Sequence, residues 1–323
     1  MQIMAIFHSA RAFARNQLRD AWSLVVAPGI AALVPWRLGY GWLRWLSRHS
    51  RLYDEALLPT ARAAAAFLGA DEAALAQQMR LVALLDHCDL YLSLLRRSFR
   101  LPWHVRVEGE WPRDGAYVAT GFHYGTGHFI FSTFRAAGQT STALYAKRAR
   151  ADYRGAPVRY WYGGLRIGDV ERVSGQPGVF RPHIRKLLDA LRDGVPVTAL
   201  ADIPPRLAEQ GQRPVRLLDR PMSLPEGLVK LARSRNVPLV PFWTEFDLDQ
   251  GTRTLVIGEP IDSGDVDAAL QILARILDER IRAFPAAWMF WAELPRWVED
   301  AHALHVAADP PAQAGDAAPA QAL

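Results

Sequence analysis

The sequence predicts an α/β domain with a mostly parallel central sheet flanked by helices, preceded by a helical N-terminal region that associates with a membrane. Half of the 323 residues are hydrophobic, which is enough for a sizeable core. From residue 103 onward, short apolar runs alternate with helical stretches. This alternation indicates a parallel sheet that is covered by helices on both faces.

The N-terminal region is predicted to be mostly helical and to carry a membrane anchor. A charge-free run of sixteen residues extends from Ala21 to Trp36, with arginines on both sides. It contains Pro28 and Pro35, and it is shorter than the ~20 apolar residues of a spanning helix. Aromatic rings of the kind that settle at lipid headgroups occur in and after it: Trp22, Trp36, Tyr40, Trp42 and Trp45. We expect a monotopic or marginally spanning anchor; the alternative is a buried hairpin of two core helices.

Residues 54–98 carry alanine and leucine at helical spacing, with Asp71 as a candidate cap for the second helix of this stretch. Cys88, the only cysteine, lies in this pattern and is predicted to be a small buried side chain. One cysteine allows neither a disulfide framework nor a cluster of thiolate metal ligands.

The α/β domain is predicted to span residues 101–300. Strands are expected at 104–109, 116–121, 141–146, 195–201, 237–243 and 252–257, and helices at 180–192, 225–235 and 265–284. After Ala301 the composition is dominated by Ala, Pro, Gln and Asp, which predicts a disordered tail over 301–323. The helical region before the domain is assigned to residues 1–100.

The charge balance favours an anionic partner. The chain has 38 Lys and Arg against 33 Asp and Glu, a net charge of +5, and nearly all of its cations are arginines. Arginine suits phosphate, carboxylate or an acidic protein, although solubility alone is an alternative explanation. The sequence has no glycine-rich phosphate loop and no paired metal-ligand spacing, so we expect no nucleotide cofactor, no metal and no nucleic-acid partner.

The segment GFHYGTGHF, residues 121–129, is the candidate site. It follows an apolar strand and is expected to open a helix, which places His123 at the carboxyl end of a strand, where α/β sheets bind ligands. Gly125 and Gly127 would let a bulky thioester approach the backbone. A histidine that takes a proton from an attacking hydroxyl contributes roughly a hundred- to ten-thousandfold in rate. On spacing alone, two histidines five residues apart, such as His123 and His128, are more often polar surface residues or a satisfied core pair than catalytic groups.

Four blocks resemble the bacterial lipid A late acyltransferases, the lauroyl and myristoyl transferases of the lysophospholipid acyltransferase-like superfamily. They are VRVEGEWPRDGAYVATGFHYGTGHF, PGVFRPHIRKLLDALRDGVPVTALAD, LLDRPMSLPEGLVKLARSRNVPLVPFW and FPAAWMFWAELPRW. The likeness covers about residues 100–298 and keeps the order and spacing of the blocks. It implies transfer of a fatty acyl group from acyl carrier protein to a lipid or glycolipid hydroxyl, on the cytoplasmic face of the bacterial inner membrane.

The resemblance also implies roles for single residues. His123 takes the position of the general base and Asp202 that of the aspartate after a strand. Arg166 or Arg172 takes the position of the substrate-clamping arginine, and Arg206 is a further candidate. Backbone N–H groups near Gly125 to Gly127, or an arginine, would hold the thioester oxyanion. A second group of cations is a candidate dock for the acidic carrier protein or anionic headgroups: Lys147, Arg148, Arg150, Arg154 and Arg159. For at least half of them the favoured alternative is a solvated surface charge.

The chain departs from the family at His128, where the family motif has Glu or Asp. Three explanations follow: another acid, Asp202 or Asp169, orients the base; the reaction or acceptor differs; or the protein is a catalytically silent relative that binds lipid or carrier protein. The closing segment also departs from the family's Trp, His, Arg and Trp pattern. A different lipid acceptor, or an aryl or polyene acyl group, therefore fits as well as lipid A. A soluble thioesterase-like hydrolase is a further alternative.

Overall fold

The structure, a computed structural model, describes residues 2–95, 102–146, 149–180, 183–208 and 211–308. Within these residues the chain forms a seven-stranded sheet in the order β1-β9-β8-β2-β5-β3-β4. Neighbouring strands run parallel except β8 and β9, which are antiparallel. The strands are β1 (Val105–Glu108), β2 (Val118–Gly121), β3 (Thr142–Tyr145), β4 (Val179–Phe180), β5 (Val197–Leu200), β8 (Leu239–Asp247) and β9 (Thr252–Ile257). The predicted fold class, a mostly parallel α/β sheet flanked by helices, is confirmed.

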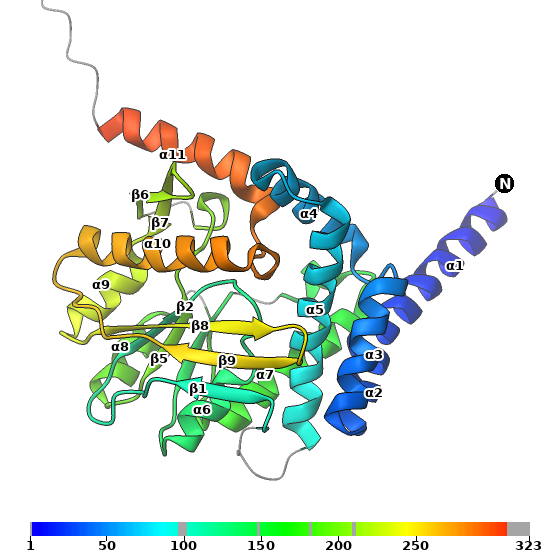
Figure 1. Ribbon diagram of the computed structural model, residues 1–323, viewed down its shortest axis with the longest axis horizontal. Coiled ribbons are helices and arrows are strands. Elements are labelled where there is room, and N and C mark those ends of the chain that lie inside the picture. The colour runs from blue at the N-terminus through cyan, green and yellow to red at the C-terminus, as the bar shows by residue number, and fades with distance from the viewer. Residues whose placement is uncertain (1, 96–101, 147–148, 181–182, 209–210, 309–323) are drawn as a thin grey trace, which may run out of the picture.

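Helices cover both faces of this sheet, because successive residues of each strand point to opposite sides. On β2, Val118 packs in one core with Leu187 and Leu277, whereas Ala119 packs in a second core with Phe134 and Val173. The first core is covered by α8 (Arg185–Arg192), α9 (Gly227–Ser234) and α10 (Val266–Ala283), and the second by α6 (Ile130–Ala136) and α7 (Pro157–Ser174). Figure 1 shows α10 and α6 on opposite sides of the strands.

The N-terminal region is helical as predicted, but its charge-free run does not form one continuous helix. The elements are α1 (Gln2–Ala21), a π-helical turn η1 (Trp22–Val26), α2 (Ala27–Leu33), α3 (Trp36–His49), α4 (Asp54–Leu68) and α5 (Glu72–Leu95). The run breaks between α2 and α3, where Pro35 begins the next helix. None of the helices in the described ranges is long and apolar enough to cross a membrane. The predicted membrane association is therefore not confirmed by the fold.

One face of the α2–α3 hairpin is buried, as the alternative interpretation expected, and the other is exposed. Ala31 and Leu43 pack against Leu84 and Leu85 of α5. Cys88 lies in the same core and is buried, as predicted. Exposed apolar side chains lie on this hairpin and on α1 and η1 before it, including Leu18, Trp22, Val26, Ile30, Leu33, Leu38 and Trp45. In Figure 1, α1 projects away from the body of the protein.

Helix α5 joins the N-terminal helices to the α/β domain. Asp89 of α5 forms a buried ion pair with Arg253 of β9. Burial raises the pKa of the Asp89 carboxyl, and the Arg253 charge opposes that rise. The indole of Trp36 donates to Gly251 O in the β8–β9 turn at 3.1 Å. The N-terminal helices and the α/β domain are therefore joined by buried contacts.

Three local predictions differ from the structure. The segment after β2 is a loop, and α6 begins only at Ile130. The hairpin β6 (Gln212–Leu217) and β7 (Arg220–Pro225) was not predicted, because its turn residues Leu218 and Asp219 adopt φ of 54° and 57° without glycine or asparagine, which usually mark such a turn. Helix α11 (Leu294–Ala308) continues into the segment predicted to be disordered, and residues 309–323 lie outside the described ranges. Short 3-10 turns are η2 (Arg150–Tyr153), η3 (Pro205–Leu207), η4 (Pro285–Ala287) and η5 (Trp291–Glu293).

Candidate active site

His123 and Asp202 meet at the carboxyl edge of the sheet. Each lies two residues after a strand, His123 after β2 and Asp202 after β5, and the last residues of these two parallel strands are paired with each other. Asp202 Oδ1 lies 3.0 Å from His123 Nδ1 and accepts the His123 backbone N–H at 2.8 Å. The Asp202 side chain is 0% exposed and that of His123 is 26% exposed. Because the carboxylate accepts the proton of Nδ1, the other ring nitrogen, Nε2, is left as a proton acceptor.

The closing segment holds this pair in place. Trp288, which is buried, donates its indole N–H to Asp202 Oδ2 at 3.1 Å, so both carboxylate oxygens accept hydrogen bonds. The Met289 backbone N–H donates to His123 O at 3.0 Å, and the Phe290 ring lies 4.7 Å from the imidazole. Sequence reasoning did not assign a role to Trp288. The tryptophan-rich composition of this segment was the available signal.

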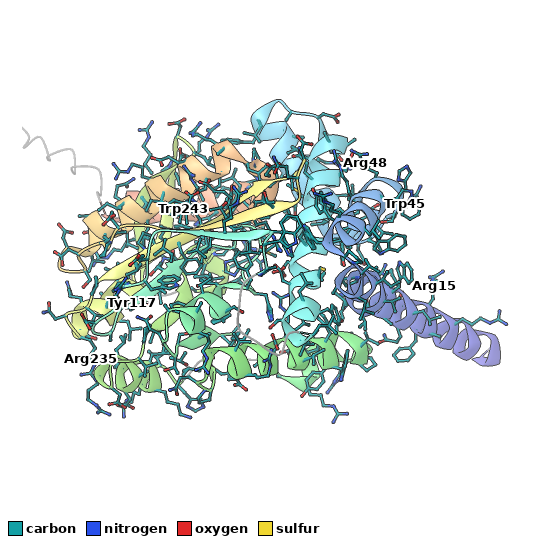
Figure 2. All side chains as sticks on the ribbon, turned by 60° about the horizontal axis from the view of Figure 1, so that its bottom comes forward. Arg15, Trp45, Arg48, Tyr117, Arg235 and Trp243 are labelled. Carbon is teal, nitrogen blue, oxygen red and sulfur yellow. The ribbon has the colours of Figure 1, made fainter. Side chains whose placement is uncertain are left out.

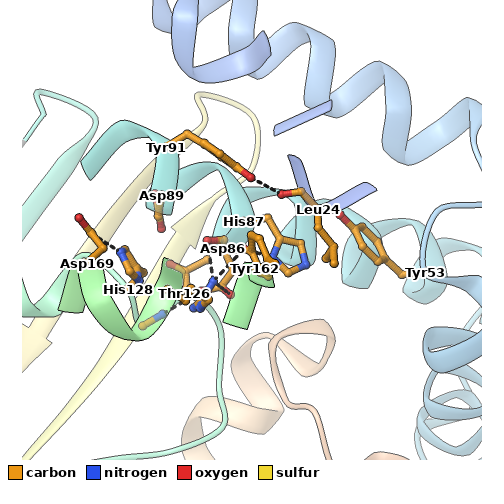
Figure 3. A network of polar contacts seen from close by, with 12 residues as sticks. Leu24, Tyr53, Asp86, His87, Asp89, Tyr91, Thr126, His128, Tyr162 and Asp169 are labelled. Atoms are coloured by element: carbon orange, nitrogen blue, oxygen red, sulfur yellow. Dashed lines mark hydrogen bonds and ion pairs between the residues drawn. The ribbon is translucent and has the colours of Figure 1, made fainter. Parts of the chain in front are cut away.

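His128 belongs to a separate pair. Its Nε2 lies 2.7 Å from Asp169 Oδ2, and the two side chains are 2% and 0% exposed. Arg172 also binds Asp169, with its Nε 3.0 Å from Oδ1. Burial alone would raise the pKa of Asp169, but hydrogen bonds from His128, Ser93 and Arg172 lower it. Of the two acids considered for orienting the base, Asp202 contacts His123. Asp169 instead contacts His128 (Figure 3).

A third polar cluster lies on α5 and α7. Arg166 binds Asp86 through both ends of its guanidinium, with Nη1 2.8 Å from Oδ2 and Nη2 3.1 Å from Oδ1. Burial alone would raise the pKa of Asp86, but Arg166 and His87 lower it. Burial lowers the pKa of His87 to about 4, against the opposing effect of Asp86, so His87 is neutral at pH 7. The His87 ring nitrogen Nδ1 lies 2.7 Å from the Tyr162 hydroxyl (Figure 3).

One cavity of about 620 Å³ brings these clusters together. It is bordered by His123, His128, Arg166, Gly125 and Gly127, and lies between the sheet and helices α6 and α7. Its apolar lining includes Phe122, Ile130, Phe131, Leu144, Ile167, Val170, Leu200, Phe242 and Met289. A space of this size and character can hold an extended apolar group beside a histidine base.

The two glycines have structural functions of their own. Gly125 has φ +73°, and a Cβ at this position would lie 2.7 Å from the Phe246 ring. Its N–H donates to Ala287 O at 2.8 Å, and the Gly127 N–H donates to Asp86 Oδ1 at 3.4 Å. Two of the predicted oxyanion donors, the N–H groups of Gly125 and Gly127, are therefore already engaged in this conformation.

Of the other predicted cations, those in the described residues do not border this cavity. Arg172 and Arg206 are not among the described residues that border it. Arg172 forms an ion pair with Asp169, and Arg206 of η3 forms an ion pair with Glu293. In the predicted docking group, Arg159 pairs with Asp20, and Lys147 and Arg148 lie outside the described residues. Arg166 is thus the predicted arginine that the structure brings to the cavity.

Within the described residues no group of three or more His, Cys, Asp or Glu side chains could hold a metal ion. No family model matches the chain, and no curated protein matches it. The arguments for function therefore come from the site itself.

Proposed function

We propose that this protein transfers an acyl group from acyl carrier protein to a hydroxyl of a lipid or glycolipid acceptor, with His123 as the general base. The observation that carries the proposal is the His123–Asp202 pair at the carboxyl edge of the sheet, whose histidine borders a mostly apolar cavity. The carboxylate lost at position 128 has a counterpart in Asp202. This favours an active enzyme over the catalytically silent relative.

In the proposed reaction, His123 Nε2 takes the proton of the acceptor hydroxyl while its oxygen attacks the thioester carbonyl carbon. The tetrahedral intermediate collapses by breaking the carbon–sulfur bond, and the proton passes from His123 to the departing thiolate. Asp202 stabilises the imidazolium between these two steps. The acyl chain lies along the apolar lining, and Arg166 attracts the anionic part of the acceptor or carrier. The protein itself forms no covalent bond to the acyl group.

Transfer of labelled acyl groups from acyl carrier protein to total bacterial lipids tests this proposal. We expect a labelled lipid with the native protein and a loss of at least about a hundredfold with His123→Ala. Arg206→Ala is the matched control, because this side chain is partly exposed and lies away from the cavity. Equal label release as free acid in the absence of any lipid would instead indicate a hydrolase, and no product from any acyl donor would contradict the proposal.

We further propose that α1 to α3 lie on the cytoplasmic face of the bacterial inner membrane. Support comes from exposed apolar side chains that neighbour arginines, among them Leu33 at 72% exposure. Figure 2 shows Arg15, Trp45 and Arg48 at the outer side of these helices. Apolar rings and leucines enter the headgroup region while arginines contact anionic lipids.

Sedimentation with vesicles of anionic phospholipid tests this orientation. We expect the variant with Leu18, Leu33 and Leu38 each changed to serine to bind at least about tenfold more weakly, because each buried methylene contributes about 0.8 kcal/mol. Leu207→Ser is the control, since Leu207 is exposed on η3 outside the N-terminal helices. Trp36 is not used because it is buried. Equal binding by both variants would contradict the proposed orientation.

A further inference from the structure

His87 of α5 borders the cavity, and the proposed reaction gives it no role. The side chain lies deep in the protein but is only half-buried, so its accessible surface faces the cavity. Its Nδ1 lies 2.7 Å from Tyr162 Oη. Its other ring nitrogen, Nε2, has no hydrogen-bond partner in the described residues and is not one of their fully buried unpaired atoms. Nε2 is therefore an accessible polar atom.

The Tyr162 hydroxyl determines which ring nitrogen of His87 carries the proton. Arg166 Nη1 lies 3.5 Å from Tyr162 Oη, and a guanidinium can only donate. Within the described residues, His87 Nδ1 is thus the acceptor available to this buried hydroxyl, and buried hydroxyls ordinarily donate. Burial raises the pKa of Tyr162 to about 12, so the hydroxyl keeps its proton at pH 7. Burial lowers the pKa of His87 to about 4, so the ring holds one proton, and that proton lies on Nε2.

His87 therefore offers an uncharged N–H donor in a fixed orientation. Its ring contacts two tyrosine rings, Tyr53 and Tyr162, each with a centre 5.3 Å away. A neutral imidazole supplies no counter-charge to an anion, and it matches a neutral oxygen that only accepts. The carbonyl oxygen of an ester or an amide is such a group. A hydroxyl fits less well, because it also needs an acceptor for its own proton.

The His87 end of the cavity adjoins the N-terminal helices. The Tyr53 hydroxyl donates to Ser23 O of η1 at 2.5 Å, while the Tyr53 ring contacts His87 (Figure 3). Two side chains of η1 are exposed, Trp22 at 39% and Val26 at 41%. One tyrosine thus separates His87 from the segment proposed to lie on the membrane. Ester and amide carbonyls of lipids lie at the boundary between headgroups and acyl chains, where such exposed apolar side chains insert.

The same helix wall is tied to the loop that carries the proposed base. Asp86, next to His87, accepts the Gly127 N–H at 3.4 Å and binds Arg166. His123 belongs to the same loop after β2 and borders the same cavity. A lipid in this cavity can therefore present a hydroxyl to His123 and another polar group to α5.

We propose that His87 binds the lipid acceptor, and that its Nε2–H donates to the carbonyl oxygen of an ester or amide in that lipid. The inference rests on the proposed function in two respects, that the acceptor is a lipid and that the N-terminal helices lie on the membrane. It concerns binding, so it can be tested without any transfer reaction.

The probes are octanoylglycerol and its ether counterpart, octylglycerol, which differ only in a carbonyl oxygen. Binding to the full chain is measured by calorimetry, with tryptophan fluorescence as a second readout. We expect the ester to bind about tenfold more tightly than the ether, because only its carbonyl accepts the His87 hydrogen bond. Octanoyl-pantetheine serves as a third probe, since its amides offer the same oxygen from the side of the acyl donor.

Two variants of His87 test the donor itself. His87→Phe keeps a planar ring without the N–H, and we expect it to lose the preference for the ester while binding the ether as before. His87→Gln retains both an N–H donor and an acceptor for Tyr162, so we expect it to keep part of the preference. His183→Phe is the matched control, because His183 is exposed and does not border the cavity.

Equal binding of ester and ether by the native protein would overturn the inference, as would failure of both to bind. A preference that survives in His87→Phe would overturn it too. Weaker binding of octanoyl-pantetheine by His87→Phe, with the ester preference unchanged, would assign His87 to the acyl donor instead. An ester preference that depends on His87 in a protein without transfer activity would contradict only the proposed transfer.

Discussion

His123 and His128 border the same cavity, each bound to a buried aspartate, and the two pairs have different surroundings. Asp202 is bound by His123 and by the neutral indole of Trp288. Asp169 is bound by His128 and by the charged guanidinium of Arg172. His123 is 26% exposed and His128 only 2%. Asp202 has no arginine or lysine partner among the described residues, so it can stabilise a proton that His123 takes up. Asp169 already forms an ion pair with Arg172.

The two pairs also differ in the origin of their carboxylates. His128, five residues after His123, is buried and joins α7 to the loop after β2 through Asp169. The orienting carboxylate comes from the end of β5. Under the proposed function, the His123–Asp202 pair acts in catalysis and the His128–Asp169 pair supports the structure.

The largest expected effect is a difference in the rate of acyl transfer between Asp202→Asn and Asp169→Asn. Asp202→Asn removes the charge that stabilises the His123 imidazolium, so we expect kcat/KM for acyl transfer to fall by about a hundredfold or more. Asp169→Asn should change it by less than about tenfold, since Asp169 contacts His128 and does not contact the base. Steady-state transfer assays on both variants, with circular dichroism to confirm folding, provide the measurement.

The opposite order of these two effects would reverse the assignment. If Asp169→Asn were the more damaging change while both variants remained folded, His128 would be the base and His123 the supporting residue. Equal losses would mean that the two pairs act as one unit.

Features that depend on neighbouring residues could be predicted from the sequence, whereas features that depend on contacts between distant residues could not. The strand before His123 and the strand before Asp202 are visible as local apolar runs, so their convergence at one sheet edge could be expected. The contact from Trp288 could not, because the closing segment has no regular strand or helix at that residue and the contact spans 86 positions of sequence. The β6–β7 hairpin was missed for a local reason, since Leu218 and Asp219 adopt positive φ without the usual residues. The packing of α2 and α3 could not be predicted either, because their buried side chains contact α5, which lies far along the sequence.

The second expected effect is a loss of folding stability when the carboxylate of the His128–Asp169 pair is removed. Asp169→Asn leaves His128 and Arg172 with a weaker, neutral acceptor, and we expect the free energy of unfolding to fall by about 1–3 kcal/mol at pH 7. The pKa of Asp169 is lowered in the folded protein. Its stabilising contribution is therefore present above its unfolded pKa and disappears as the pH falls through its lower folded value.

Urea denaturation of the native protein and Asp169→Asn over a range of pH provides the measurement. The difference between them should be constant from neutral pH down to about pH 4 and shrink below it, given an unfolded aspartate pKa near 3.9. A difference that grows as the pH falls would contradict this account. Asp249→Asn, at an exposed surface pair, is the control and should leave the stability nearly unchanged.

The smallest expected effect concerns the hydrogen bond from Trp288 to Asp202. Trp288→Phe keeps most of the ring packing and removes the N–H donor to Asp202 Oδ2, while Trp297→Phe removes a buried indole donor to Ser223 O at 2.9 Å. We expect Trp288→Phe to lower kcat about tenfold with little change in KM, whereas Trp297→Phe alters stability alone. Because a carboxylate that loses a donor attracts the imidazolium proton more strongly, the acid limb of the pH–rate profile should move to higher pH only in Trp288→Phe. If both variants lose activity in proportion to stability and neither profile moves, Trp288 is a packing residue and Asp202 is held by His123 alone.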